Sequence, residues 1–456
     1  MRACIVKRAG RDSLIHMTCD KKMLRCIVLL PGLTLLAILA ELYAVDPTAY
    51  YRALTRIGID PWKYPFIDWE YIGAGVKCWN EGINVYITNP CDTANRPHDY
   101  SPLWLRAVFI PTDRTWTMLI GLALVLGFLL SLFWVVKPVT WRELIIFALT
   151  CTSTMAVFAL ERGNVDIIIF IMLVVASVLS TGPLANRILS YALILLAGLL
   201  KFYPLILLST ALRERPRTFF AIVAASGLII VGFVYLFRAE LAAIGPNIPH
   251  GEYESDFIGS VNLPFGLPRY MLRLFPELAE FAWFTALPYA VMAGLLVVTA
   301  VQVIHLARNS NLASAFVKMP KRDVMFLVVG AALNAACFFA GQSHGYRGVH
   351  LIFVVAGLVA MRRASDDPTT GAMLTRAVII VVFLMWEGFF RQILLHVQGP
   401  EFNLFWLIRE VLWWRLAAVL LAMLAIFGVK SELFAVLKQW RGLQRGTNPL
   451  PPDNRA

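Results

Sequence analysis

Long apolar stretches with almost no charge dominate the pattern of hydrophobic and polar positions along the chain. A helix needs about 20 apolar residues to cross a hydrocarbon core of about 30 Å. The segments near that length are residues 26–44, 116–136, 144–160, 165–182, 218–237, 281–307, 324–340, 348–361, 377–390 and 412–429. The pattern therefore predicts an all-α polytopic membrane protein with about ten full crossings.

One further apolar segment is interrupted. Residues 188–200 and 205–212 are apolar, and Lys201-Phe202-Tyr203-Pro204 separates them. At a rise of about 1.5 Å per residue the first piece reaches only about 20 Å, so the segment forms either one kinked crossing or a hairpin of short helices. Basic residues gather on the cytoplasmic side of membrane proteins. The hairpin puts a clear majority of the 41 Lys and Arg residues inside, whereas a single crossing puts most of them outside. We therefore predict the hairpin.

This topology makes residues 1–429 a single transmembrane domain and residues 430–456 a cytoplasmic tail. Both termini are then cytoplasmic, and two long segments, 45–115 and 238–280, lie outside. The chain has no Asn-x-Ser/Thr acceptor, which favours a bacterial envelope. We expect a multi-pass protein of the plasma (inner) membrane whose active site faces outside.

The composition agrees with a membrane protein. Of the 456 residues, 59% are apolar and only 15% are charged, whereas soluble domains have about half and about a quarter. The formal net charge of +12 could suggest nucleic acid. However, the excess of basic residues falls on the inner side, where it would face anionic lipid. We expect membrane lipid, and no nucleic acid, among the partners.

The first outer segment contains the best candidate chemistry. Its bulky residues recur at steps of 3, 4 and 3 along one helix face: Trp69, Ile72, Val76 and Trp79. This spacing predicts an outer juxtamembrane helix in the headgroup layer. Asp68 at its start is either a helix cap or a general base. Glu70 lies about 200° further round the helix, so the two carboxylates share a pocket only if the turn is irregular.

Other ionisable residues fall at the outer ends of the predicted crossings. They occupy the turn 161–166, the hairpin tip at Lys201 and the segment 344–347. Such groups are costly at membrane depth and are candidates for function, although Lys and Arg can also snorkel to the surface. Cys78 and Cys91 share the first outer segment, where they are either bridged or two free thiols.

The order and spacing of these motifs resemble a known family. An acidic residue opening an aromatic helix, then Gly82…Val85-Tyr86 and Tyr100-Ser101-Pro102, resembles the first loop of polyprenyl-phosphate-sugar-dependent GT-C glycosyltransferases. Arg162-Gly163-Asn164-Val165-Asp166, followed about 35 residues later by Lys201-Phe202-Tyr203-Pro204, is similar to glycosyltransferase family 87. That family includes bacterial mannosyltransferases and related arabinofuranosyltransferases. The resemblance covers roughly residues 60–350.

The resemblance implies a GT-C-like bundle that moves a sugar, mannose or a pentose, from a polyprenyl-phosphate donor to an envelope glycolipid or glycan. Asp68 would be the catalytic base of an inverting displacement. Arg162, Lys201, and His344 or Arg347 would stabilise the departing phosphate. The substrate- or phosphate-binding residues expected in this way are Glu70, Tyr100, Arg162, Asn164, Asp166, Lys201, Tyr203, His344 and Arg347. No motif supports a cofactor, and none is strong enough to assert a metal.

Two other functions share these features. Pro-interrupted apolar segments are typical of the discontinuous helices of transporters of small solutes or lipid-linked sugars. Those segments usually occur in matched pairs at the membrane midplane, whereas only one such interruption stands out here. An envelope polymerase or ligase that uses lipid-diphosphate donors is the other alternative.

Overall fold

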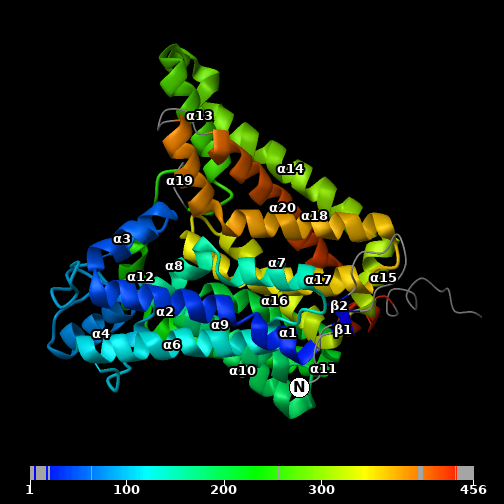
Figure 1. Ribbon diagram of the computed structural model, residues 1–456, viewed down its shortest axis with the longest axis horizontal. Coiled ribbons are helices and arrows are strands. Elements are labelled where there is room, and N and C mark those ends of the chain that lie inside the picture. The colour runs from blue at the N-terminus through cyan, green and yellow to red at the C-terminus, as the bar shows by residue number, and fades with distance from the viewer. Residues whose placement is uncertain are drawn as a thin grey trace, which may run out of the picture.

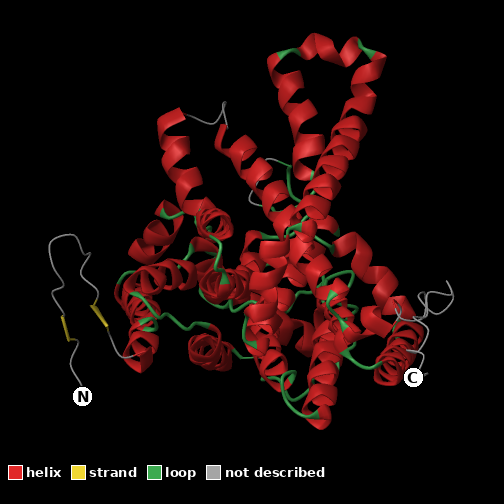
Figure 2. Ribbon diagram, turned by 90° about the vertical axis from the view of Figure 1, so that its right-hand side faces the viewer, coloured by secondary structure: helices red, strands yellow, loops and turns green. Residues whose placement is uncertain are grey.

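The structure is a computed structural model that describes residues 21–62, 64–111, 113–253, 257–398, 404–436 and 438. It also describes two short antiparallel strands, β1 (Ile5–Val6) and β2 (Met17–Thr18). The rest of the described chain consists of helices and loops (Figure 2). The expectation of an all-α protein is confirmed for the body of the molecule.

Nine helical segments of the described chain are long and apolar enough to cross a membrane, which confirms a polytopic architecture. They contain α1 (Lys21–Ile27) with α2 (Leu30–Val45), α6 (Arg114–Val135), α10 (Leu184–Lys201), α11 (Pro216–Leu236), α14 (Leu287–Arg308), α16 (Lys321–Phe339), α17 (Leu351–Ala364), α18 (Pro368–Met385) and α20 (Leu404–Val429). The pair α7 (Trp141–Cys151) and α8 (Thr154–Arg162) adds a tenth if it counts as one span. Helix α9 (Val165–Leu179), expected as a full crossing, has 15 residues and is too short to be one of the candidate spans.

The remaining elements are short or lie outside these spans. They are α3 (Pro47–Arg56), α4 (Ile67–Asn80), α5 (Pro102–Leu105), η1 (Tyr203–Arg213), α12 (Arg238–Ile244), η2 (Gly245–Asn247), α13 (Asn262–Leu274), η3 (Pro276–Glu280), η4 (Ala282–Ala286), α15 (Ser310–Lys318), η5 (Gly345–His350) and α19 (Glu387–Gln398), where η denotes a 3₁₀ helix.

The predicted crossing 144–160 is broken in the middle. Helices α7 and α8 meet at a bend of 43°. Ser153 begins α8 as its N-cap, and its side chain accepts a hydrogen bond of 3.3 Å from the backbone N–H of Ala156. The side-chain oxygen of a serine at a helix start accepts a hydrogen bond from a first-turn N–H group that has no partner within the helix. The Thr152-Ser153 pair can therefore end one helix and begin the next. The break aims the C-terminal end of α8 towards α4.

The interrupted segment forms a hairpin. Helix α10 ends at Lys201, and the chain turns at Phe202, whose φ is 52°. Its second arm, η1, is an 11-residue 3₁₀ helix rather than an α-helix. At about 2.0 Å rise per residue it covers about 22 Å, enough to return along α10. Glu214 after η1 accordingly pairs with Arg187 in the first turn of α10 at 3.0 Å.

Helices α16 and α17 form the centre of the bundle. In the 18-residue apolar stretches of these two spans, 72% and 89% of the residues are buried, whereas the value is 11% for the spans of α11 and α14. The two central helices pack closely through glycine: a Cβ atom at Gly357 would lie 2.4 Å from Cβ of Leu327. Small residues permit such an approach where lipid supplies no hydrophobic force between helices. The peripheral helices keep their apolar side chains exposed, as a lipid-facing surface requires.

Helix α4 lies at one end of the bundle, whereas α1 and α15 lie towards the opposite end (Figure 1). Its bounds agree with the aromatic helix predicted from the sequence. The spacing predicted a single apolar face, whereas the structure buries more of the helix than that face. Tyr71 and Ala74 are buried as well as Trp69 and Ile72, so the rest of the fold encloses α4 on most sides.

Candidate functional site

The site is centred on the carboxylate of Asp68, in the first turn of α4. The residue is only 8% exposed. Phe66, which precedes the helix, has φ 66° and ψ 24°, a left-handed conformation that is uncommon for a bulky residue. Its backbone N–H donates to the carbonyl oxygen of Glu161 at 2.6 Å. This contact anchors the start of α4 to the end of α8.

Two residues donate hydrogen bonds to Asp68, one to each oxygen. Nη1 of Arg96 lies 2.9 Å from Oδ1, and Nδ2 of Asn164 lies 2.8 Å from Oδ2. Nη1 of Arg162 is 4.0 Å from Oδ1. An ionised carboxylate offers about four acceptor positions. These partners therefore orient Asp68 and leave it able to accept a hydrogen bond from a further donor.

Asn164 connects Asp68 to the cationic part of the site. It is fully buried and serves as the N-cap of α9, accepting a hydrogen bond of 3.0 Å from the N–H of Asp166. The same Oδ1 atom accepts a bond of 2.9 Å from Nζ of Lys201. Gly163 precedes it with φ +57°, the left-handed helix end that glycine adopts most easily. The Arg-Gly-Asn-Val-Asp motif is therefore one compact turn between α8 and α9.

Lys201 ends α10 and points into the same cluster. Its Nζ atom lies 2.9 Å from Oδ1 of Asp166. It also faces the rings of Tyr100 at 5.1 Å and Tyr346 at 5.4 Å, within the range of cation–π attraction. The next residue, Phe202, has the positive φ noted above. Strained backbone at both Phe66 and Phe202 directly flanks the site, as is common where function requires a fixed geometry.

A second group of polar side chains continues from Asp166. The hydroxyl of Tyr203 donates to Oδ1 of Asp166 at 2.8 Å and lies 2.6 Å from Nε2 of His350. Arg347 stacks over the Tyr203 ring at 5.5 Å and donates to Oγ of Ser343 at 2.7 Å. The buried Nε of Arg347 has no hydrogen-bond partner among the described residues. Arg347 can therefore still donate to an anion.

Two of the expected site residues lie apart from this cluster. Glu70 turns away from Asp68, and its carboxylate accepts hydrogen bonds from Tyr64 and, at 2.8 Å, from Thr93. The α-helix is regular here, so the separation follows from its geometry. His344 lies behind Tyr346, on whose ring it stacks at 5.1 Å. Tyr100 borders the cluster, with its hydroxyl 3.4 Å from Nδ2 of Asn164.

The sequence interpretation missed Arg96. Its guanidinium group donates to Asp68, to the backbone carbonyl of Ile67 at 2.9 Å and to both oxygens of Asp92. It also lies 4.5 Å from the Tyr71 ring. Burial alone lowers the pKa of Arg96, but the hydrogen bonds that Arg96 donates to Asp92 and the charge of Asp68 outweigh this and raise it. The sequence feature that could have indicated this ion pair is the spacing of four residues between Asp92 and Arg96.

His350 was missed as well. It is 1% exposed and stacks beside Phe170 at 6.2 Å, in addition to its contact with Tyr203. The expected motif ended at Arg347, one 3₁₀ turn earlier. Because residues i and i+3 share a face of a 3₁₀ helix, the histidine three positions after a candidate arginine was the signal.

An apolar cavity of about 190 Å³ lies next to the site. It is lined by α2, α6, α7 and α8, with Leu36, Leu122 and Leu160 among its walls. Its polar border consists of Tyr50 and Glu161, whose hydroxyl and Oε1 atoms are 3.3 Å apart. Because Glu161 directly precedes Arg162, this border adjoins the polar cluster.

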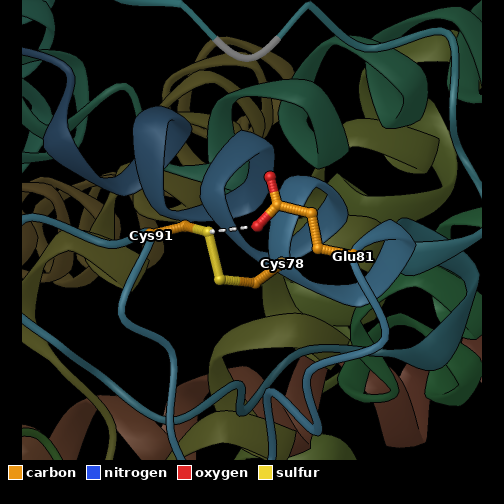
Figure 3. A group of neighbouring side chains, drawn as sticks. All are labelled: Cys78, Glu81 and Cys91. Carbon is orange, nitrogen blue, oxygen red and sulfur yellow. Dashed lines mark hydrogen bonds between the residues drawn. A yellow bond between two sulfur atoms is a disulfide. The ribbon is translucent and has the colours of Figure 1, made fainter.

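Two cysteines close to the site form a disulfide. Cys78 in α4 and Cys91 have Cα atoms 5.9 Å apart, and their sulfur atoms are bonded (Figure 3). Oε2 of Glu81 lies 3.9 Å from the Cys91 sulfur. In the described chain, these three residues are the one group of His, Cys, Asp or Glu side chains whose ligand atoms lie close enough together to hold a metal ion. The bond between the sulfurs leaves no thiolate for a metal.

The structure thus brings together Asp68, Arg162, Asn164, Asp166, Lys201 and Tyr203, which come from five different elements, α4, α8, α9, α10 and η1. This arrangement can orient a carboxylate as a proton acceptor and hold a phosphate group close to it. Comparisons of the chain with protein-family models, with curated proteins and with solved structures found no match to any of them.

Proposed function

We propose that the protein is an integral membrane glycosyltransferase that uses a polyprenyl-phosphate-linked sugar as donor. The observation that carries this proposal is the position of one buried carboxylate, Asp68, among cationic side chains at the ends of apolar helices. Arg96 lies 2.9 Å and Arg162 4.0 Å from it, and Lys201 connects to it through Asn164. A proton acceptor beside cations suits a reaction in which a hydroxyl loses a proton and a phosphate leaves.

The reaction is a single displacement at the anomeric carbon. The acceptor oxygen forms a bond to that carbon, and its proton moves to a carboxylate oxygen of Asp68. The bond from carbon to the phosphate oxygen breaks, and the lipid phosphate leaves with the electron pair. Attack from the face opposite the phosphate inverts the anomeric configuration. Arg347, Arg162 and Lys201 stabilise the growing negative charge because their donors are fixed before the reaction.

The apolar cavity supports a lipid-linked donor. Its walls come from α2, α6, α7 and α8, and its polar border at Glu161 adjoins Arg162. A polyprenyl chain in this cavity would hold its phosphate next to the cluster. The acceptor is a hydroxyl of an envelope glycolipid or glycan, and the transferred sugar is mannose or a pentose. In this proposal the site faces the outside of the plasma membrane.

Transfer from a radiolabelled polyprenyl-phosphate sugar, measured in membranes that contain the full chain, tests the proposal. Asp68→Asn preserves the size and hydrogen bonding of the side chain but removes its basicity, so we expect turnover to fall about 10²-fold or more. Binding of a non-hydrolysable polyprenyl-phosphonate sugar should survive. Glu70→Gln is the matched control, because Glu70 lies on the same helix but contacts Tyr64 and Thr93.

The result that would overturn the proposal is near-normal transfer by Asp68→Asn at equal membrane levels. Asp68 would then serve as an ordinary buried helix-start residue. Use of a lipid-diphosphate donor alone would instead indicate an envelope polymerase or ligase.

A transporter is the second candidate, and the interrupted helices favour it. The α7–α8 pair bends by 43°, and η1 is an irregular arm of the hairpin. Discontinuous helices are typical of transport proteins. Uptake of a labelled solute into vesicles without any glycan product would support this function. We favour the transferase because Lys201 and Asp68 meet at helix ends, away from the middle of the spans.

A further inference from the structure

A second, larger cavity lies at the other end of the bundle from Asp68. Its volume is about 730 Å³. Its walls come from the α9–α10 turn, the end of η1 with the start of α11, the α15–α16 connection and the end of α20. Arg187 and Arg213 line it at the base of the hairpin, whereas Lys201 and the candidate site are at the tip.

The cavity has an excess of cationic side chains. Arg187 and Arg213 both pair with the buried carboxylate of Glu214, at 3.0 and 3.4 Å. Three further cations, all of them exposed residues at the mouth of the cavity, belong to its lining: Arg215, Lys321 and Lys430. Their side chains make no hydrogen bond or ion pair with any residue that the structure describes. The one other acidic residue in the described lining is Glu432, so the cavity has a net positive charge.

Three helix N-termini open into the same cavity. Helices α10, α11 and α16 are 18, 21 and 19 residues long, and the lining includes the first residue of α10, the first residue of α16 and the N-cap residue of α11. None of the three has a side-chain hydrogen bond at its N-cap. The first N–H groups of a helix lack partners within the helix, and the helix dipole makes that end attractive to anions. Uncapped N-termini and unpaired cations therefore favour the same kind of ligand.

We propose that this cavity is a binding site for a phosphate group. Arg215 and Lys321 would donate to its oxygens. The cavity lies at the ends of candidate spans, beside the exposed side chains of Leu184 and Val317. The phosphate therefore comes from the headgroup of an anionic phospholipid or from a soluble phosphate compound. The proposal uses no residue of the candidate transferase site and does not depend on that function.

The chain's own tail does not supply the missing negative charge. Residues 439–456, which lie outside the described part, contain Arg441, Arg445 and Arg455 but a single acidic side chain, Asp453. A tail with more basic than acidic groups would add to the positive charge of the cavity. An external anion is therefore the ligand that the charge of Arg215, Lys321 and Lys430 favours.

Binding of a fluorescent short-chain phosphatidylglycerol to the purified full chain in neutral detergent tests the site. We expect Arg215→Gln/Lys321→Gln to bind it about tenfold more weakly or worse, because the double variant removes two charged donors to the phosphate oxygens. The matched control is Arg217→Gln/Arg322→Gln, which removes the same charge from neighbouring positions outside the lining. Phosphatidylcholine is the neutral comparison lipid, and size-exclusion chromatography checks that both variants are folded.

Competition separates the two sources of phosphate. Displacement of the labelled lipid by millimolar inorganic phosphate would support a site that accepts soluble phosphate, and failure to displace it would support a lipid site. Equal losses in the two double variants would overturn the proposal, because the cavity would then matter no more than general surface charge. Equal binding of phosphatidylglycerol and phosphatidylcholine to the wild-type protein would overturn it too.

Discussion

The side-chain amide of Asn164 donates a hydrogen bond of 2.8 Å to Oδ2 of Asp68, from 96 positions further along the chain. The amide can donate only through nitrogen, so its oxygen faces the opposite way, towards Lys201 at 2.9 Å. One buried residue thereby fixes the spacing between the candidate base and a cation. A regular helix start alone does not require such an arrangement.

Replacing Asn164 by alanine should separate catalytic from structural effects. Asn164→Ala removes the N-cap of α9, which costs about 1 kcal/mol, and also releases Asp68 and Lys201. We expect transfer activity to fall by about tenfold or more, measured as turnover in membranes. Asn309→Ala is the matched control, since Asn309 caps α15 through a bond of 2.9 Å to the Leu312 N–H. Equal activity losses in the two variants would show that capping alone explains the effect.

Arg96 should be essential for both stability and turnover. Its partner Asp92 has a fully buried side chain, and leaving a buried charge without its partner costs about 3–5 kcal/mol. We expect Arg96→Ala to lower the unfolding temperature clearly. Arg96→Lys keeps the charge but loses the planar fork, so turnover should fall more than donor binding.

Arg106→Ala provides the comparison for Arg96. Arg106 pairs with Glu240 at 3.2 Å, but its side chain is 49% exposed. Exposed ion pairs contribute about 0–1 kcal/mol, so the melting temperature should hardly change. A loss as large as that of Arg96→Ala would contradict the assigned role of Arg96.

The disulfide should stabilise the loop that positions Arg96. Cys91 directly precedes Asp92, so the bond ties the end of α4 to the residue that holds Arg96. Cross-links closing loops of about 15 residues contribute about 3 kcal/mol in the chain-entropy model. Cys78→Ser/Cys91→Ser should therefore melt at a lower temperature and lose part of its turnover. When the wild-type protein is alkylated without prior reduction, its mass should show that neither Cys78 nor Cys91 has reacted. Alkylation of both would contradict the bridge.

Acid should destabilise the segment between α4 and α5 through His98. Its ring is fully buried between Tyr71 and Tyr86, and burial lowers the pKa of His98 to about 4. An unfolded histidine takes up a proton near pH 6.5. The folded state resists this proton, so stability present above pH 6.5 should fall by about 2–3 kcal/mol as the pH decreases towards 4.

Thermal unfolding of wild type and His98→Gln between pH 7.5 and pH 4 measures this effect. The glutamine variant should lose less stability on acidification, because it cannot take up the proton. Burial also raises the pKa of Asp99, which acts in the opposite direction, so the informative quantity is the difference between the two proteins. Parallel curves would contradict the assignment to His98.

Local patterns in the sequence predicted most of the helices. The aromatic spacing of residues 66–79 anticipated α4, and the interruption at Lys201 anticipated the turn of the hairpin. The 200° separation of Asp68 and Glu70 also followed from helix geometry alone. These features depend on neighbours within one or two turns, and the amino-acid order contains that information directly.

Other features depended on contacts between distant segments. The stretch 144–160 is continuously apolar, yet it bends at Thr152-Ser153, and the end of α8 contacts the start of α4 through the Phe66 N–H and the Glu161 carbonyl oxygen. The sequence left the pairing of Cys78 with Cys91 open, since two cysteines in one loop need not come within bonding distance. Arg96 lies in a loop without periodicity, and its partners follow from how that loop folds over α4.

The sequence by itself determined that this protein is a bundle of apolar helices with its candidate chemistry near helix ends, because hydrophobic length and charge placement act segment by segment. Only the tertiary structure decided which of those ends meet. Asp68, Asn164 and Lys201 become neighbours when α4, α9 and α10 pack together. Hydrophobic burial is non-directional, so the hydrogen bonds and close contacts of the folded chain select one arrangement from the many that the apolar pattern allows.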